Sequence, residues 1–181
     1  MSTRWGATPE EWHHFNKTLG LTTELLPVVS NPNAVISPRS SITTLGKTPS
    51  LYNRERQVIG MPGWPDHITT EEEIARWSAE PDYGICVNTR LIRAIDVDVT
   101  DPQIAESILA LCQSMMPGPL AIRRRSNSPK FLIPLQVPGV FGKRTIKTPD
   151  GIIEFLANGQ QFVACGTHPS GVRYEWVGGL P

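Results

Sequence analysis

Two aspartates stand two residues apart in an apolar stretch, Ile95-Asp96-Val97-Asp98-Val99. Because side chains alternate across a strand, the two carboxylates share one face about 7 Å apart, and the three apolar residues share the other. Carboxylates this close repel one another unless a cation lies between them. Hard divalent cations such as Mg²⁺ or Mn²⁺ favour such oxygen ligands. The pair therefore predicts a metal site, although two exposed aspartates beside a helix start give the same short pattern.

A third carboxylate stands alone in a later apolar segment. Glu154 is the only charged residue of Gly151–Leu156, and no acidic residue occurs between positions 119 and 149. A carboxylate in such surroundings needs a partner, although a charge on an edge strand can also serve to block aggregation. An Asp-x-Asp strand with a later acidic strand is the smallest ligand set for a two-metal phosphoryl-transfer site.

Seven basic residues lie between positions 119 and 149. Arg123 and Arg125 share one face of an expected strand, whereas Arg124 shares the face of Ile122 and is expected near a sheet edge. Lys130 begins the next strand, after a tight turn. Guanidinium forks and a lysine ammonium are natural phosphate ligands, although an ordinary basic surface is the common alternative. The second basic group lies in an expected loop over 138–150: Lys143, Arg144 and Lys147.

Three other polar residues are weaker candidates for contact with a nucleotide or a nucleic acid strand: Lys47, Gln161 and His168. Gln160 and Gln161 place one amide on each face of the strand that they begin, so one of them could bind a base, a ribose or a phosphate. A lone histidine in a loop is more often only solvated.

The elements that must position these residues form an α+β pattern with a mostly antiparallel sheet. Helices are expected over 8–20, with Thr8 as the cap, over 70–78, with Thr69 or Thr70 as the cap, and from Asp101 to about Met115. Residues 30–67 are poor in regular structure. Gly151–Leu156 and Gln160–Cys165 are expected to form a hairpin. The other expected strands are 23–29, on a sheet edge because of Pro27, and 84–88, 91–99, 119–125, 131–137 and 173–176.

Composition excludes several classes of protein. A length of 181 residues suits one domain with its own core. The three cysteines are odd in number and widely spaced, which argues against a disulfide scaffold and fits a reducing cytosol. No apolar run approaches the ~18 residues of a membrane helix, and no secretory signal is recognisable, so we expect a cytoplasmic protein. The zero net charge hides an acidic stretch over 66–106 and a basic one over 107–181, which suits a site that joins cations and phosphates.

These residues, in this order, resemble the N-terminal primase–polymerase domain of phage and plasmid replication proteins, in the archaeo-eukaryotic primase superfamily. Asp96 and Asp98 resemble its first, metal-binding motif, and Glu154 its third. Lys130 stands where the second motif usually has a histidine. The resemblance covers about Leu25 to Trp176. Further segments that carry it are Gly46–Pro49 with Gly63-Trp64, Tyr83–Ile85, and Gly159–Ala164 followed by His168-Pro169 and Tyr174–Trp176.

The resemblance implies an RRM-like catalytic sheet beside an N-terminal αβ unit. It implies one domain over 1–177, divided into 1–83 and 84–177, and a linker-like end at 178–181 that leads to a helicase region or a replicative helicase. The implied activity is primer synthesis on single-stranded DNA from NTPs or dNTPs, with Mg²⁺ or Mn²⁺, in the bacterial host cytoplasm. The implied roles are metal binding for Asp96, Asp98 and Glu154, triphosphate binding for Arg123, Arg125, Ser126 and Lys130, and template binding for Lys143, Arg144 and Lys147.

Other functions stay open. A nucleic-acid-binding replication module could keep the fold without the chemistry. A sugar transferase also uses Asp-x-Asp, but the first 83 residues show neither a Rossmann-like alternation nor a Gly-rich phosphate loop. A metal nuclease often has a lysine just after an acidic strand, whereas Phe155 and Leu156 follow Glu154. Nucleotide-dependent product formation distinguishes these possibilities.

Overall fold

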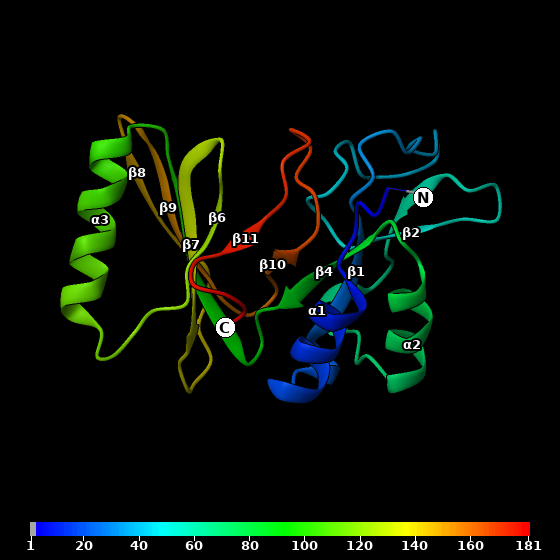
Figure 1. Ribbon diagram of the computed structural model, residues 1–181, viewed down its shortest axis with the longest axis horizontal. Coiled ribbons are helices and arrows are strands. Elements are labelled where there is room, and N and C mark those ends of the chain that lie inside the picture. Colours follow the sequence, from blue (N-terminus) through cyan, green and yellow to red (C-terminus); the bar gives the residue numbers. More distant parts are fainter. Residues whose placement is uncertain (1–2) are drawn as a thin grey trace. The chain divides into compact units, whose positions relative to one another are not determined.

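The computed structural model describes residues 3–181, which divide into two compact units (Figure 1). The first unit runs to Asn88 and also takes in Gln161–Tyr174, and the second comprises Thr89–Gln160 and the residues from Glu175 onward. All strand pairs within the named strands are antiparallel. The predicted α+β class is therefore confirmed. Within residues 3–181, no helix has both the length and the apolar character needed to cross a membrane.

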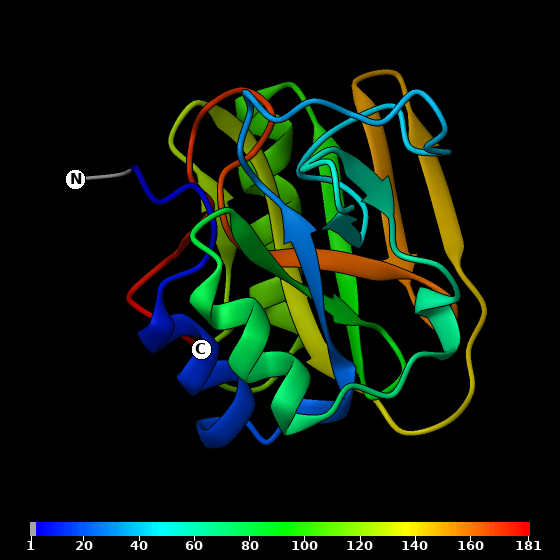
Figure 2. The ribbon, with the colours of Figure 1, turned by 90° about the vertical axis from the view of Figure 1, so that its right-hand side faces the viewer.

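The first unit holds a three-stranded sheet of order β1-β4-β10, a two-stranded sheet β2-β3 and short helices. Figure 2 shows α1 and α2 side by side. The elements are α1 (Pro9–His13), η1, a π-helix (His14–Thr18), η2 (Thr22–Glu24), β1 (Leu25–Val29), β2 (Ser50–Tyr52), β3 (Val58–Gly60), η3 (Trp64–Asp66), α2 (Glu71–Ala79), β4 (Tyr83–Asn88) and β10 (Gln161–Cys165).

Capping and apolar burial explain the two helices. The Thr8 hydroxyl accepts a hydrogen bond from the Glu11 amide, and Thr70 does the same with Glu73, so both predicted capping boxes are present. These bonds satisfy amides that have no partner within the helix. The helices meet through buried Trp12 and Trp77, whose ring centroids lie 6.4 Å apart.

β1 lies at one edge of its sheet, as Pro27 predicts. Proline has no amide hydrogen to donate to a second neighbouring strand, so an edge suits it. β4 lies between β1 and β10, and all six of its residues are buried. This agrees with the continuous apolar character of its sequence.

The second unit is a six-stranded sheet of order β11-β6-β7-β5-β9-β8 with one long helix. Figure 1 shows α3 along one face of this sheet. The elements are β5 (Ile92–Val99), α3 (Pro102–Met115), β6 (Arg123–Arg125), β7 (Ser128–Gln136), β8 (Arg144–Thr148), β9 (Gly151–Leu156) and β11 (Glu175–Trp176).

The core of the second unit lies between β5 and α3. Val97 and Val99 are fully buried and pack in one cluster with Ala105 and Leu109 of α3 and with Phe131 of β7. Asp101 caps the helix by accepting hydrogen bonds from the amides of residues 103 and 104. The helix therefore covers the face of β5 that carries valines and leaves the opposite face open.

The predicted hairpin of β9 with β10 is wrong. β9 pairs with β5 and β8, whereas β10 pairs with β4 in the first unit. A turn is present, closed by a hydrogen bond from the Gln160 amide to the Ala157 carbonyl. Both strands are apolar, and the turn residues between them do not specify whether the two strands pair with each other or with strands of different sheets.

The predicted loop over 138–150 is also wrong in part, because Arg144–Thr148 forms β8 at the edge of the sheet. Four of its five residues are exposed. An exposed strand lacks the apolar–polar alternation on which a sequence-based prediction of a strand depends.

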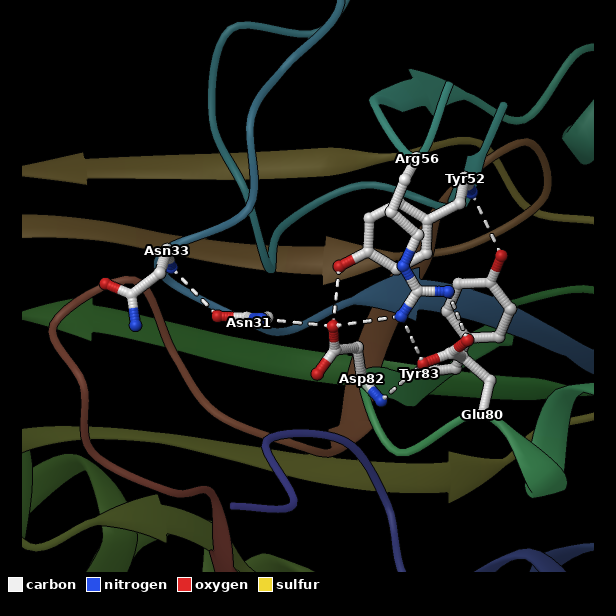
Figure 3. Close-up of polar contacts among 7 residues, drawn as sticks. All are labelled: Asn31, Asn33, Tyr52, Arg56, Glu80, Asp82 and Tyr83. Atoms are coloured by element: carbon white, nitrogen blue, oxygen red, sulfur yellow. Dashed lines mark hydrogen bonds and ion pairs between the residues drawn. The ribbon is translucent and has the colours of Figure 1, made fainter. Parts of the chain in front are cut away.

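Polar contacts tie the β2–β3 turn of the first unit to the segment before β4 (Figure 3). Arg56 binds Glu80 through two nitrogens, at 2.6 and 2.8 Å, and its guanidinium carbon lies 4.0 Å from the centroid of the Tyr52 ring. The Tyr52 hydroxyl donates to Asp82 at 2.6 Å, and the Tyr83 hydroxyl accepts from the Tyr52 amide at 2.9 Å. Arg56 lowers the pKa of the Glu80 carboxyl, and burial raises the pKa of the Tyr52 phenol.

Gly151 marks the closest approach of β9 to β5. Its φ is +150°, and a Cβ there would lie 2.1 Å from the Asp98 carbonyl oxygen. We expect Gly151→Ala to lower the free energy of unfolding by about 1–3 kcal/mol, since β9 must move away from β5. Gly142→Ala, where no atom lies within 4 Å of the added Cβ, is the control and should cost less than about 0.5 kcal/mol. Chemical denaturation measures both, and an equal loss would contradict the packing argument.

The Arg56–Glu80 pair predicts a pH-dependent stability. The pKa of the Glu80 carboxyl is lower in the folded state than its ordinary value of 4.5, so the ionised carboxylate stabilises the fold at pH values above 4.5. This contribution is lost as the pH falls through the folded-state pKa. We therefore expect Arg56→Met to lower the melting temperature at pH 7, and the difference from the unchanged protein to shrink toward about pH 3. Arg54→Met, at an exposed arginine of the same turn, is the control. A difference that stays constant with pH would count against the pair.

Candidate functional site

β5 presents carboxylates on the face that α3 leaves open. Val97 and Val99 are buried against the helix, so Asp96 and Asp98 project to the other face, as the alternation predicts. The Asp98 side chain is 55% exposed. Asp98 is therefore exposed, and Asp96 half-buried, on a strand with paired neighbours on both sides.

Glu154 joins this face from the adjacent strand. In the register of β5 with β9, Asp96 lies directly opposite Glu154, and Asp98 lies opposite Ile152. Side chains directly opposite each other on antiparallel strands have Cβ atoms about 5 Å apart. β9 runs between β5 and β8, so Glu154 is not a charge on an edge strand. The three predicted carboxylates thus share one face of one sheet.

Two lysines contact these carboxylates. The Lys130 ammonium lies 3.2 Å from Oδ1 of Asp98, and the Lys143 ammonium lies 2.7 Å from Oε1 of Glu154. Lys130 comes from β7, on one side of β5, and Lys143 comes from the segment just before β8. Two ammonium groups therefore form ion pairs with the acidic face.

The donor chemistry of this face fits a hard divalent cation, because three carboxylates supply only oxygen ligands. Within the described part of the chain, however, no three His, Cys, Asp or Glu side chains converge closely enough to hold a metal ion. Asp98 and Glu154 instead form ion pairs with lysines. A metal would thus require these side chains to reorient.

The arginines of β6 divide between the two faces of the sheet. Arg123 is buried and lies in the same cross-strand row as Asp96, with Leu132 between them. Arg124 lies on the α3 face, where it binds Glu106 at 2.8 Å and where its guanidinium carbon is 5.4 Å from the centroid of the Phe131 ring. The predicted position of Arg124 near a sheet edge is confirmed, because only the two-residue β11 lies beyond β6.

A cavity of about 320 Å³ opens at the turn between β6 and β7. Basic, hydroxyl and aromatic groups line it together, a combination that suits a nucleoside phosphate. Sequence reasoning selected Arg125 and Ser126 but missed Trp176, because its pairing with Arg123 depends on the placement of β11. The lining residues are Arg124, Arg125, Ser126, Ser128, Glu175, Trp176 and Val177.

The second basic group does not share one face. Lys147 lies opposite Ile152 and shares the open face with Asp98, whereas Arg144 lies opposite Phe155 and faces the side of α3. Lys143 contacts Glu154. Only part of this group therefore borders the carboxylates.

The remaining candidates belong to the first unit. The Gln161 side-chain amide donates to the carbonyl of Lys47 at 2.8 Å, which joins β10 to the segment before β2. His168 contacts the Ser170 hydroxyl at 2.9 Å and meets the Tyr174 ring edge-on. Carboxylates and arginines lie in the second unit, and Lys47, Gln161 and His168 in the first.

The first unit also contains a cavity of about 400 Å³. It brings together Thr48 and Pro49 with Gly63 and Trp64, which come from two of the sequence segments singled out above. Asn88 supports this loop by donating from its side-chain amide to the carbonyls of Trp64 and Pro65. The long irregular stretch therefore has a defined arrangement.

Fold and site together define an α+β protein with an acidic, cation-attracting sheet face and a basic cavity at the β6–β7 turn. The chain belongs to the family of bifunctional DNA primase/polymerase N-terminal domains, whose model matches residues 19–181. This confirms the family that the sequence motifs suggested. Among curated proteins, none matches the chain in sequence.

The cavity at the β6–β7 turn predicts a role for Arg125 in nucleotide binding. A charge-assisted hydrogen bond to phosphate contributes about 1.5–3 kcal/mol, so Arg125→Ala should raise the Kd for a nucleoside triphosphate about ten- to a hundredfold. Arg144→Ala removes the same charge from the other face of the sheet and should change the Kd little. Isothermal titration measures both variants. Equal weakening would mean that only the overall charge matters.

Proposed function

We propose that this chain is a template-directed nucleotidyltransferase that synthesises primers on single-stranded DNA. The observation that carries the proposal is the placement of Asp96 opposite Glu154, with Asp98 on the same open face. Membership in the primase/polymerase family supports it. We further propose that it acts in phage or plasmid replication, in the bacterial cytoplasm, together with a helicase.

In this proposal Asp96, Asp98 and Glu154 hold Mg²⁺ or Mn²⁺. When bound, two such ions would lower the pKa of the attacking 3′-hydroxyl and neutralise the departing pyrophosphate. The pairing of β5 and β9 is important here, because both strands have paired neighbours that fix the separation of the backbones that carry the carboxylates.

The incoming NTP or dNTP is assigned to the basic residues of β6 and β7. The cavity at the β6–β7 turn, lined by Arg125 and Ser126, supports this assignment. Arg123 and Lys130 lie nearer the carboxylates, as the cross-strand row of Arg123 and the ion pair of Lys130 indicate. A triphosphate bound there would lie between the cavity and the acidic face.

Single-stranded DNA is assigned to the second basic group and to the first unit. The exposure of Lys143, Arg144 and Lys147 supports their role as ligands of the template phosphates. Lys47, Gln161 and His168 are assigned to contacts with the nucleotide or the template.

A second candidate function is nucleic-acid binding without catalysis. The ion pairs of Lys130 with Asp98 and of Lys143 with Glu154 favour it, because they neutralise two carboxylates without a metal. Such a module would bind DNA through the same basic residues.

A primer-synthesis assay distinguishes the two functions. The chain is incubated with single-stranded DNA, labelled NTPs or dNTPs and Mg²⁺ or Mn²⁺. We expect labelled oligomers from the unchanged protein and a loss of at least about 10²-fold for Asp96→Ala, since a metal ligand is removed. Asp150→Ala, in the turn between β8 and β9, is the control and should keep full activity.

Full synthesis by Asp96→Ala would overturn the assignment of the site. The absence of product with every nucleotide, together with DNA binding that weakens steeply with salt, would support the binding module instead. Circular dichroism of each variant confirms that the fold is kept.

A further inference from the structure

Lys143 makes the shorter of the two contacts between lysines and the acidic face. Its ammonium lies 2.7 Å from Oε1 of Glu154, and the same oxygen accepts a hydrogen bond from the Thr145 hydroxyl at 3.5 Å. The Lys143 side chain is 38% exposed and the Glu154 side chain is 25% exposed. The ion pair is therefore accessible, and its two partners can separate without unfolding.

This contact reduces the repulsion between two carboxylates. Glu154 lies directly opposite Asp96, and like charges in that position destabilise a sheet. The strands cannot slip to separate them, because a shift by one residue would expose Val97 and bury Asp96. A cation at Glu154 reduces this repulsion without a change of register.

An ammonium and a divalent cation compete for this position. Both are cations and both need the lone pairs of the Glu154 carboxylate, so binding of one disfavours the other at the same oxygen. The failure of the three carboxylates to converge in the structure agrees with this, since Glu154 is turned to Lys143 and Asp98 to Lys130.

We infer that Lys143 is a positioning residue that holds Glu154 in place of a divalent cation and releases it when the cation binds. The inference rests on the proposed metal site. Release would free a positive charge on the segment between β7 and β8, where a DNA phosphate could accept it. Metal binding and template binding would then favour one another, because each removes a competitor of the other.

Lys147 provides a matched comparison. It is exposed, lies on the same open face of the sheet and carries the same charge, but it is opposite Ile152 rather than Glu154. Removing either lysine makes the face more negative by one charge. Only removal of Lys143 takes away the direct competitor.

The experiment is a titration of the full chain with Mn²⁺ alone, with free Mn²⁺ followed by electron paramagnetic resonance. We expect Lys143→Ala to bind Mn²⁺ about two- to fivefold more tightly than the unchanged protein, the range that an exposed ion pair supports. The fold-change in Mn²⁺ affinity caused by Lys147→Ala should be less than about half of that caused by Lys143→Ala. Lys143→Arg keeps the positive charge, so it should bind Mn²⁺ with the affinity of the unchanged protein. Thermal melts of each variant show that the fold is kept.

Equal tightening by Lys143→Ala and Lys147→Ala would overturn the inference and leave the proposed function standing. The same holds if Lys143→Arg behaves like Lys143→Ala, because loss of the cation would then not be the cause. If Mn²⁺ binds neither the unchanged protein nor Lys143→Ala, both the inference and the proposed metal site fail.

Discussion

Repulsion among carboxylates on one sheet face is the constraint on which the second unit depends. The opposite face of the same strand is buried against α3 through Val97 and Val99, so the register of β5 cannot change to separate the charges. Relief has to come from cations brought to the face. The lysines that contact Asp98 and Glu154 supply it in the structure, and Arg123 of β6 and Lys147 of β8 lie in the same cross-strand rows as the aspartates.

This balance of charges depends on acids and bases that lie on different strands of one sheet. β5 carries the acids at the centre of the sheet, and the basic β6 and β8 flank it at a distance of one intervening strand on each side. An acidic site that receives a triphosphate needs both kinds of charge within a side chain's reach. Lys130 of β7 connects the two by its contact with Asp98.

The first unit uses a different device, hydrogen bonds that order a long irregular segment. Arg56 and Tyr52 fix the β2–β3 turn through Glu80 and Asp82 (Figure 3), and the Gln161 side chain holds the backbone at Lys47. Such contacts give defined positions to residues with little regular secondary structure. The same irregular segment lines the cavity beside Trp64.

Local sequence by itself determined the helix starts and, for the apolar strands, the faces of their side chains. Capping at Thr8 and Thr70, the edge position of β1 and the alternation of Asp96 and Asp98 all follow from interactions within a few residues, so they could be predicted. The grouping of the three carboxylates was foreseen from strand patterns and family resemblance, but not their register.

Only the tertiary structure decided which strands pair. β9 and β10 look like a hairpin in sequence, yet each joins a different sheet, and β8 has no apolar pattern that marks it as a strand. The pairing of strands that are far apart in sequence depends on which strand edges are still unpaired when the core forms, and the residues next to a strand do not specify this. For the same reason the contact of Lys143 with Glu154 appears only in the folded chain: β8 must first lie beside β9.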